Sequence, residues 1–506
     1  MSDPAPQVST TTGTVRGERR NGLAVFRGIP YAAPPVGPLR FGAPRPARPW
    51  DGVRDATRLG PPPPQSGPAA QAVPAASAQV VAGDDWLTLN VWSPDLGDAG
   101  LPVLVWIHGG VYLADFSGNP LYEGSAIAEL GMTVVTCNYR TGAEGFALFP
   151  DTPANRGLLD QIAVLEWVRE NIRGFGGDPD RVTVCGQSAG AGSIATLLSM
   201  ERAAGLFGRA ILQSVPGMYC TTAFATAVAT ELTRLLGTAP APADPQKLAE
   251  TVTALIATMP AESARWGRAG QAATPFAPVV DGEILPELPW SALAEGATAA
   301  RAAGVDLLLG HTRDEARLFT AMAGLLGQVT DAQADTALRA FAPGPDGPHS
   351  YRTAFPAASA QDLWELVLSD ALFRIPTQRL AEFHTAAGGR TFRYELCWPS
   401  PAAGGALGSC HSLDVPLLFG SYDNPGAQLL LGPDQPSAET HAMADTIRRN
   451  WVAFASTGDP GWPAARPDQP RTRILDTVPA TADHVEEASL RIWSGQPLEP
   501  FDLPPA

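Results

Sequence analysis

The sequence has almost no lysine, few cysteines and no long apolar segment. Lys247 is the only lysine among 35 basic residues, and 51 acidic residues leave a net charge of −16. A surface of this charge repels phosphate groups, so we exclude nucleic acid and anionic membranes as expected partners. No stretch approaches the ~18 apolar residues of a membrane-spanning helix, and the N-terminus lacks the apolar core of a secretory signal.

The cysteines argue against a disulfide-bonded, secreted protein. Their number is odd and their spacing is unpaired (Cys137, Cys185, Cys220, Cys397 and Cys410). The sequence also contains no Asn-x-Ser/Thr acceptor for N-linked sugars. Both observations favour a reduced compartment, so we expect a cytoplasmic protein.

Apolar segments alternate with a helix-like segment in the first half of the chain. Residues 101–110, 131–140 and 182–186 are near-continuous apolar runs, typical of strands covered on both faces. Residues 158–172 carry apolar side chains at helical spacing. Strand, helix and strand in this order predict a doubly wound α/β unit. Later strands are expected at 209–213, 307–309 and 392–396.

We expect the 506 residues to form a single domain with helical insertions. The segments at about 220–300 and 316–390 have mainly helical patterns and are candidates for a cap over the carboxyl edge of the sheet. Residues 60–83 are rich in proline and alanine, which predicts a surface loop. No internal repeat or long flexible linker separates the chain into units.

The motif Gly186-Gln187-Ser188-Ala189-Gly190 follows one of these strands directly. A strand, a serine between spaced glycines and a helix together predict a nucleophile elbow, a strained turn that holds the serine hydroxyl out of the sheet. The glycines leave room for the close approach of neighbouring backbone. The motif alone is weak, because chance supplies roughly 0.2 to 0.3 matches in a chain of this length.

A second glycine turn ends the strand at residues 101–110. His108-Gly109-Gly110-Val111 resembles the loop whose amides bind a developing oxyanion, together with the amide of the residue after the nucleophile, here Ala189. The alternative is a simple glycine turn at a strand end. The position of this segment beside a predicted nucleophile elbow favours its interpretation as an oxyanion loop.

A serine nucleophile also needs a histidine base and an orienting carboxylate. Hydrolases with this elbow place them in the order serine, acid, histidine. His411 follows a predicted strand and leaves room for an acid before it, which favours it over His311. Asp314 and Glu315 follow another strand, and the spacing does not choose between them. A zinc site around Cys410 and His411 has no supporting ligand spacing.

Many ordered segments resemble the type-B carboxylesterases, a family that includes carboxylesterases, cholinesterases and bacterial para-nitrobenzyl esterases. The similarity extends over nearly the whole chain, and the chain most resembles the bacterial members. It includes FRGIPYAAPPVGPLRF, DDWLTLNVW, VWIHGGVY, NYRTGAEGF, GQSAGAGS, GHTRDEARLF, CHSLDVPLLFG and WVAFASTGDP.

The resemblance implies an α/β-hydrolase fold, in which a large, mostly parallel sheet is flanked by helices and carries a helical cap. It implies a serine carboxylic-ester hydrolase that acts through an acyl-enzyme, with no cofactor or metal. It gives the acid to Glu315, and it implies an ion pair between Arg40 and Asp84. The implied site residues are Ser188, His411 and Glu315, with oxyanion amides from Gly110, Val111 and Ala189 and a turn shaped by Gly109. It does not determine the oligomeric state.

Departures from the family pattern bear on the substrate. Trp86 replaces a disulfide cysteine, Val111 replaces the third oxyanion glycine, and Ala316 replaces a glycine after the acid. Gln187 replaces the usual glutamate, which removes a negative charge beside Ser188. We therefore expect neutral small-molecule esters as substrates. The alternatives are a non-catalytic binding or adhesion protein of the same fold, and an amidase or an esterase specialised for one xenobiotic.

Overall fold

The computed structural model describes residues 4–67, 80–81, 83–483 and 485–504. Most of the loop expected at 60–83, namely residues 68–79 and 82, lies outside the described residues. At the base of this segment, Val81 donates its N–H to the Leu59 carbonyl at 2.8 Å, and Leu59 pairs with Val80 in a parallel bridge.

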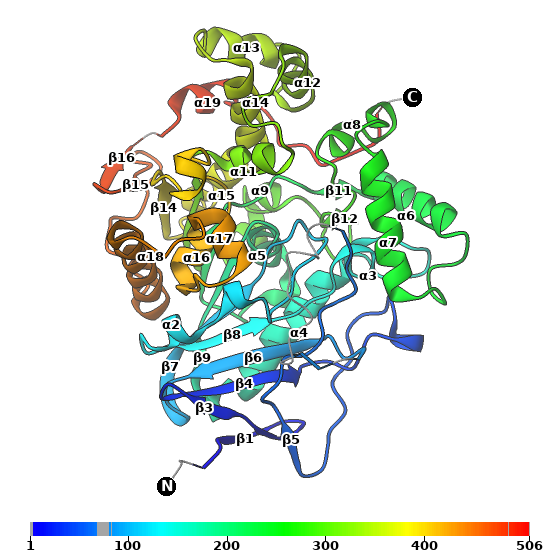
Figure 1. The fold of residues 1–506 in the computed structure, drawn as a ribbon, viewed down its shortest axis with the longest axis vertical. Helices are drawn as coiled ribbons and strands as arrows, with labels where there is room; N and C mark the ends of the chain where they lie inside the picture. Colours follow the sequence, from blue (N-terminus) through cyan, green and yellow to red (C-terminus); the bar gives the residue numbers. More distant parts are fainter. Residues whose placement is uncertain (1–3, 68–79, 82, 484, 505–506) are drawn as a thin grey trace.

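An eleven-stranded sheet forms the centre of the molecule (Figure 1). Every neighbouring pair from β8 through β15 is parallel, whereas the pairs at both edges are antiparallel. The mostly parallel sheet is as predicted. The order across the sheet is β16 (Ala480–Ala482), β15 (Thr472–Leu475), β14 (Thr391–Leu396), β13 (Asp306–Thr312), β10 (Arg209–Gln213), β9 (Phe175–Gln187), β7 (Gly97–Ile107), β8 (Thr133–Cys137), β6 (Thr88–Ser93), β4 (Leu23–Pro30) and β3 (Glu18–Arg20).

Two cores cover the two faces of this sheet. Along β7, Val103, Val105 and Ile107 belong to one core, while Leu104 and Trp106 belong to the other. Side chains alternate between faces along a strand, so a continuous apolar run is buried on both sides. The first core includes α4 (Arg156–Asn171) and α5 (Ala189–Ser199), and the second includes α2 (Ser125–Ala128), α16 (Asp414–Phe419), α17 (Pro425–Leu431) and α18 (Ala438–Thr457).

Smaller elements complete the described chain. A three-stranded sheet joins β1 (Gln7–Thr10), β2 (Gly13–Arg16) and β5 (Val53–Asp55), and a two-stranded one joins β11 (Cys220–Thr221) and β12 (Val279–Val280). Short helices lie at α3 (Gly142–Phe146) and α19 (Glu487–Ile492).

Helices dominate the two segments expected to be insertions. The first contains α6 (Thr222–Leu236), α7 (Pro245–Thr258), α8 (Ser263–Gln271), α9 (Pro289–Ala292) and α10 (Gly296–Ala302). The second contains α11 (Glu315–Met322), α12 (Asp331–Phe341), α13 (Gly347–Ala354), α14 (Ala360–Ser369), a π-helical turn at Asp370–Arg374 and α15 (Ile375–Ala386). Figure 1 shows α6 to α8 at one side of the molecule and α12 to α14 at its upper end.

The prediction of an ion pair between Arg40 and Asp84 is wrong. Arg40 instead pairs with Glu144 on α3, with 2.5 Å between Nη2 and Oε1, and both side chains are buried. Asp84 is exposed, and its neighbour Asp85 pairs with Arg54. Arg40 also donates to the Ala243 carbonyl before α7, so it joins the N-terminal segment to two other parts of the chain.

Candidate active site

Ser188 lies on the turn between β9 and α5, where its backbone is strained. Its φ is 54° and its ψ is −124°, a conformation that a residue with a side chain rarely adopts. A Cβ added at Gly190 would lie 2.0 Å from the Ile107 carbonyl oxygen, and one at Gly186 would lie 2.7 Å from Gly190. Only glycines fit this crossing of strand and helix, which is the steric reason for the motif.

The loop after β7 is strained as well. Gly110 has a φ of 101°, and Val111 and Tyr112 have φ values of 56° and 59°. Leu113 and Ala114 both donate their N–H groups to the Gly110 carbonyl, which closes the turn. Within the described residues, the amides of Gly110 and Val111 donate to no protein group. Positive φ at a β-branched residue is costly and is found mainly at functional sites.

The loop after β7 lies directly against the serine turn. A Cβ added at Gly109 would lie 3.3 Å from the Ser188 Cβ and 3.0 Å from the Gln187 carbonyl oxygen. Ala189 is the first residue of α5, and the first amides of a helix have no acceptor within it. The loop after β7 and the start of α5 therefore meet at the Ser188 turn.

The two neighbouring carboxylates, Asp314 and Glu315, have different partners. Glu315 Oε2 lies 2.5 Å from His411 Nδ1, and Glu315 Oε1 accepts the Thr312 N–H at 2.9 Å. Asp314 Oδ2 instead accepts the N–H of Ser409 at 2.9 Å, so this side chain ties down the loop that carries His411. The structure thus brings Glu315, and not Asp314, against the histidine.

Glu315 is completely buried, yet it is surrounded by groups that favour its charge. Burial acts to raise the pKa of the Glu315 carboxyl, but the charge and hydrogen bond supplied by His411 outweigh it, so that pKa lies below its usual value. His311, the other strand-end histidine, is different. Burial and the nearby Arg374 charge lower the pKa of His311 to about 3, so it stays neutral.

Two aromatic rings enclose His411. The Phe373 ring centroid lies 4.4 Å from that of His411, and the Phe319 centroid lies at 5.1 Å. Phe319 projects from α11, four residues after Glu315, and Phe373 comes from the π-helical turn. These contacts place α11 and the π-helical turn against the histidine. A π-helical turn often marks a functional site, but its position cannot be read from helical periodicity.

Within the described residues, Gln187 and not Ser188 is the hydrogen-bond partner of His411 Nε2. This histidine atom lies 3.0 Å from Gln187 Nε2, and no hydrogen bond joins Ser188 Oγ to His411 among the described residues. In the sequence, Gln187 indicated only the loss of a negative charge beside Ser188. Its contact with the histidine links residues 224 positions apart, and only the structure shows it.

An apolar cavity of about 250 Å³ lies beside these elements. Leu113, from the loop after β7, and Met322, from the end of α11, both line it. The rest of its wall comes mainly from α7, with Leu248, Val252 and Ile256. Glu144 also lines the cavity, but its charge is paired with Arg40.

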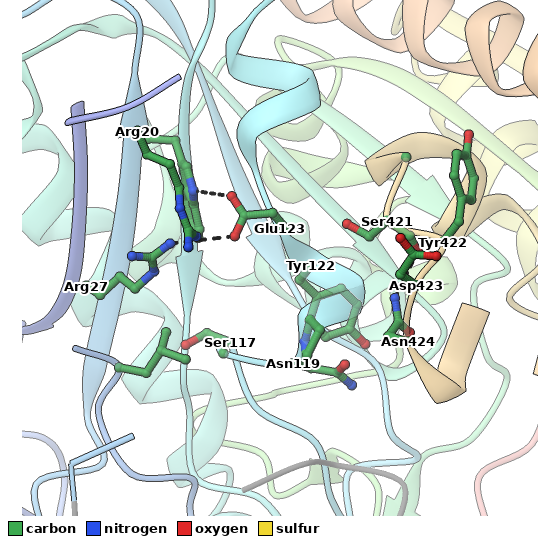
Figure 2. Close-up of a pocket in the computed structure, with 15 residues that line it drawn as sticks. Arg20, Arg27, Ser117, Asn119, Tyr122, Glu123, Ser421, Tyr422, Asp423 and Asn424 are labelled. Carbon is green, nitrogen blue, oxygen red and sulfur yellow. Dashed lines mark hydrogen bonds and ion pairs between the residues drawn. The ribbon is translucent and has the colours of Figure 1, made fainter. Parts of the chain in front are cut away.

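A polar cavity of about 450 Å³ lies apart from the serine and histidine (Figure 2). Figure 2 shows Arg20 and Arg27 on one side, Ser421–Asn424 on the other and Tyr122 between them. Glu123 in this cavity accepts from Trp92 Nε1 at 2.7 Å and faces Arg27 at 3.7 Å. The cavity carries charges of both signs, and Arg27 is paired with Glu123, so it indicates no single ligand.

Comparison with known proteins decides the family. The family profile described as the carboxylesterase family matches residues 4–344. The chain is 37% identical over 484 residues to the para-nitrobenzyl esterase of Bacillus subtilis (strain 168), covering 93% of this chain and 94% of that protein. The chain belongs to the carboxylesterase family. This carboxylesterase is also 34% identical over 484 residues to the phenmedipham hydrolase of Pseudarthrobacter oxydans, covering 93% of this chain and 95% of that protein.

Solved structures agree with the family. A PNB esterase superimposes with a TM-score of 0.85 at 32% identity, covering 97% of this chain and 99% of that one. The carboxylesterase EST55 of Geobacillus stearothermophilus, at pH 6.2, gives 0.82 at 31% identity, covering 96% and 99%. The protein is therefore a carboxylesterase-type serine hydrolase with the α/β-hydrolase fold, and we discard the non-catalytic alternative.

Three further observations concern the cysteines, metal binding and membrane-spanning helices. All five cysteines are unpaired and buried. Within the described residues, no cluster of histidine, cysteine and carboxylate side chains could hold a metal ion. No helix in the described chain is long and apolar enough to cross a membrane.

Gly110→Ala tests the loop after β7. The added Cβ would lie 2.1 Å from the Ala114 carbonyl oxygen, so the turn must move and its free amides with it. We expect kcat for a p-nitrophenyl ester to fall about 10²–10³-fold, as when one oxyanion donor is lost. Gly131→Ala is the matched control, because Gly131 also has positive φ (89°) but open space around it. Equal kcat values for the two variants would contradict a role for the loop.

Proposed function

We propose that this carboxylesterase hydrolyses neutral small-molecule esters with Ser188 as nucleophile, His411 as base and Glu315 as the orienting acid. The observation that carries the proposal is the 2.5 Å contact between Glu315 Oε2 and His411 Nδ1, beside a strained serine that ends β9. A buried carboxylate in this position fixes the histidine tautomer and stabilises the imidazolium that forms during the reaction.

The reaction has two halves. His411 Nε2 takes the Ser188 proton while Oγ attacks the ester carbonyl, and the oxyanion is held by the amides of Gly110, Val111 and Ala189. The carbon–oxygen bond then breaks, and the alcohol leaves with the proton from His411. Water attacks the acyl-enzyme by the same route, which releases the carboxylic acid and restores Ser188. Gly109 shapes the turn that presents these amides.

The apolar cavity beside the loop supports the neutral substrate class. Leu113 follows the two strained residues after Gly110, and Met322 ends the helix that begins at Glu315. The cavity therefore borders both segments that carry the proposed chemistry. Its apolar wall and its one paired carboxylate favour an uncharged, lipophilic ester group. The cytoplasmic location and the single-domain organisation stay predictions.

A panel of p-nitrophenyl esters tests the substrate class. We expect kcat/KM for a neutral butyrate ester to exceed that for the negatively charged hemisuccinate by about 100-fold or more, because the cavity offers no cation to pair with the added charge. The two acyl chains have similar length, so charge is the main difference. Comparable kcat/KM values, or a preference for the hemisuccinate, would contradict neutral specificity. Hydrolysis of the matching p-nitroanilide at a similar rate would favour an amidase.

A further inference from the structure

Gln187 lies at the centre of the proposed site. It is the last residue of β9, immediately before Ser188, and its side chain is buried. Its Nε2 lies 3.0 Å from His411 Nε2. Its Oε1 is directed to the other side, where a Cβ added at Gly109 would lie 3.1 Å away. The amide therefore occupies the space between the histidine and the loop after β7.

The partners of His411 fix which atom of this contact carries the hydrogen. An ionised carboxylate can only accept a hydrogen bond, so the 2.5 Å contact with Glu315 Oε2 requires Nδ1 of His411 to donate. A neutral imidazole then has a lone pair at Nε2. An amide nitrogen can only donate, so Gln187 donates its N–H to this lone pair. It is the same lone pair that must accept the proton of Ser188.

We propose that Gln187 is a positioning residue that keeps His411 in its neutral, proton-accepting form and so extends the activity of this carboxylesterase to lower pH. This inference rests on the proposed roles of Ser188 and His411. A donor at Nε2 stabilises the neutral ring and opposes its protonation. A carboxylate at position 187 would do the reverse, because it would attract the imidazolium. The Gln187 amide is exchanged for the Ser188 hydroxyl when the serine attacks.

Several ionisable groups lie near the histidine: Glu315 and Asp414 interact with it directly, and Cys410 precedes it in the chain. Farther out, His311 interacts with Glu315, and Arg374 interacts with His311. Burial raises the pKa of Cys410 to about 12 and lowers that of His311 to about 3, so both are neutral between pH 4 and 9. Burial also raises the pKa of Asp414 to about 6, so this group titrates within the working range. Asp414 is present in every variant below, and differences between variants therefore report on position 187.

The test is the acidic limb of the kcat/KM–pH profile, because this limb reports protonation of the base in the free enzyme. Relative to wild type, we expect the limb of Gln187→Met to move up by about half to one pH unit, because the variant has the same length but no donor. We expect Gln187→Glu to move it by more than one unit, because an opposite charge in contact favours the imidazolium. Gln161→Met, which removes a buried amide bonded to Ser193 on α5, should leave the limb unchanged.

The outcomes separate this inference from the proposed function. A limb that stays in place in both Gln187 variants, or that moves down in Gln187→Met, would overturn the role of Gln187. If Gln187→Glu does not fold, the position of the acidic limb in Gln187→Met still tests the role of Gln187. Ser188→Ala is measured in parallel: full activity there would overturn the proposed nucleophile, whereas an inactive Ser188→Ala with unmoved limbs would overturn only the role of Gln187.

Discussion

Ser188→Ala is expected to lower kcat/KM for a p-nitrophenyl ester by about 10⁴–10⁶-fold while the protein stays folded. Without the hydroxyl no acyl-enzyme forms, and only the oxyanion amides and substrate binding remain to accelerate the reaction with water. The strained φ of Ser188 is adopted by alanine with similar difficulty, so the turn should keep its geometry. Hydrolysis is followed by nitrophenolate release, and folding by thermal unfolding.

Ser199→Ala is a suitable control for this first prediction. Ser199 is a buried serine at the end of α5, the helix that Ser188 precedes, and it donates to the Thr196 carbonyl at 2.7 Å. Its loss should change kcat/KM by less than about threefold, since it contacts none of the proposed site residues. Retention of more than a few per cent of wild-type activity by Ser188→Ala would show that another group is the nucleophile.

Glu315→Gln should be the second most damaging change, with kcat about 10³–10⁴-fold lower. The amide replaces a buried, ionised carboxylate that accepts from His411 Nδ1 at 2.5 Å. A glutamine can turn its NH₂ group to the ring, which places the proton on Nε2 and removes the lone pair that Ser188 needs. The loss should appear in kcat rather than in KM, because Glu315 does not line the apolar cavity.

Asp314→Asn provides the matched comparison on the neighbouring residue. Its side-chain oxygen can still accept from the Ser409 N–H, so the loop with His411 should keep its position. We expect kcat to fall by less than about tenfold. If Asp314→Asn loses its activity and Glu315→Gln does not, then Asp314 and not Glu315 is the orienting acid.

Much of the sheet was predictable because burial on both faces leaves a continuous apolar run. β7 was predicted from such a run, and β10 has the expected bounds of Arg209–Gln213. β15 and β16 were missed. They lie at the edge, have only four and three residues, and lack that pattern. Short edge strands owe their conformation to their neighbours rather than to their own sequence.

The candidate site was predictable where chemistry is local in sequence. The turns at Ser188 and after β7 leave no room for side chains at their glycines, and this requirement appears in the sequence directly as the spacing of glycines within each motif. Contacts between distant side chains were not predictable in this way. The contact of Gln187 with His411, the Phe373 ring over that histidine and the pairing of Arg40 with Glu144 all depend on how separate elements pack.

The most direct test of the central claim is covalent trapping with diethyl p-nitrophenyl phosphate, followed by intact-mass measurement and peptide mapping. Attack by Ser188 Oγ would displace p-nitrophenolate and leave a diethylphosphoryl group on the serine. We predict one adduct per chain, located on Ser188, with esterase activity lost in proportion to its formation and with no adduct in Ser188→Ala. An adduct on a different residue that accounts for the loss of activity, or full activity in a stoichiometrically modified protein, would contradict it.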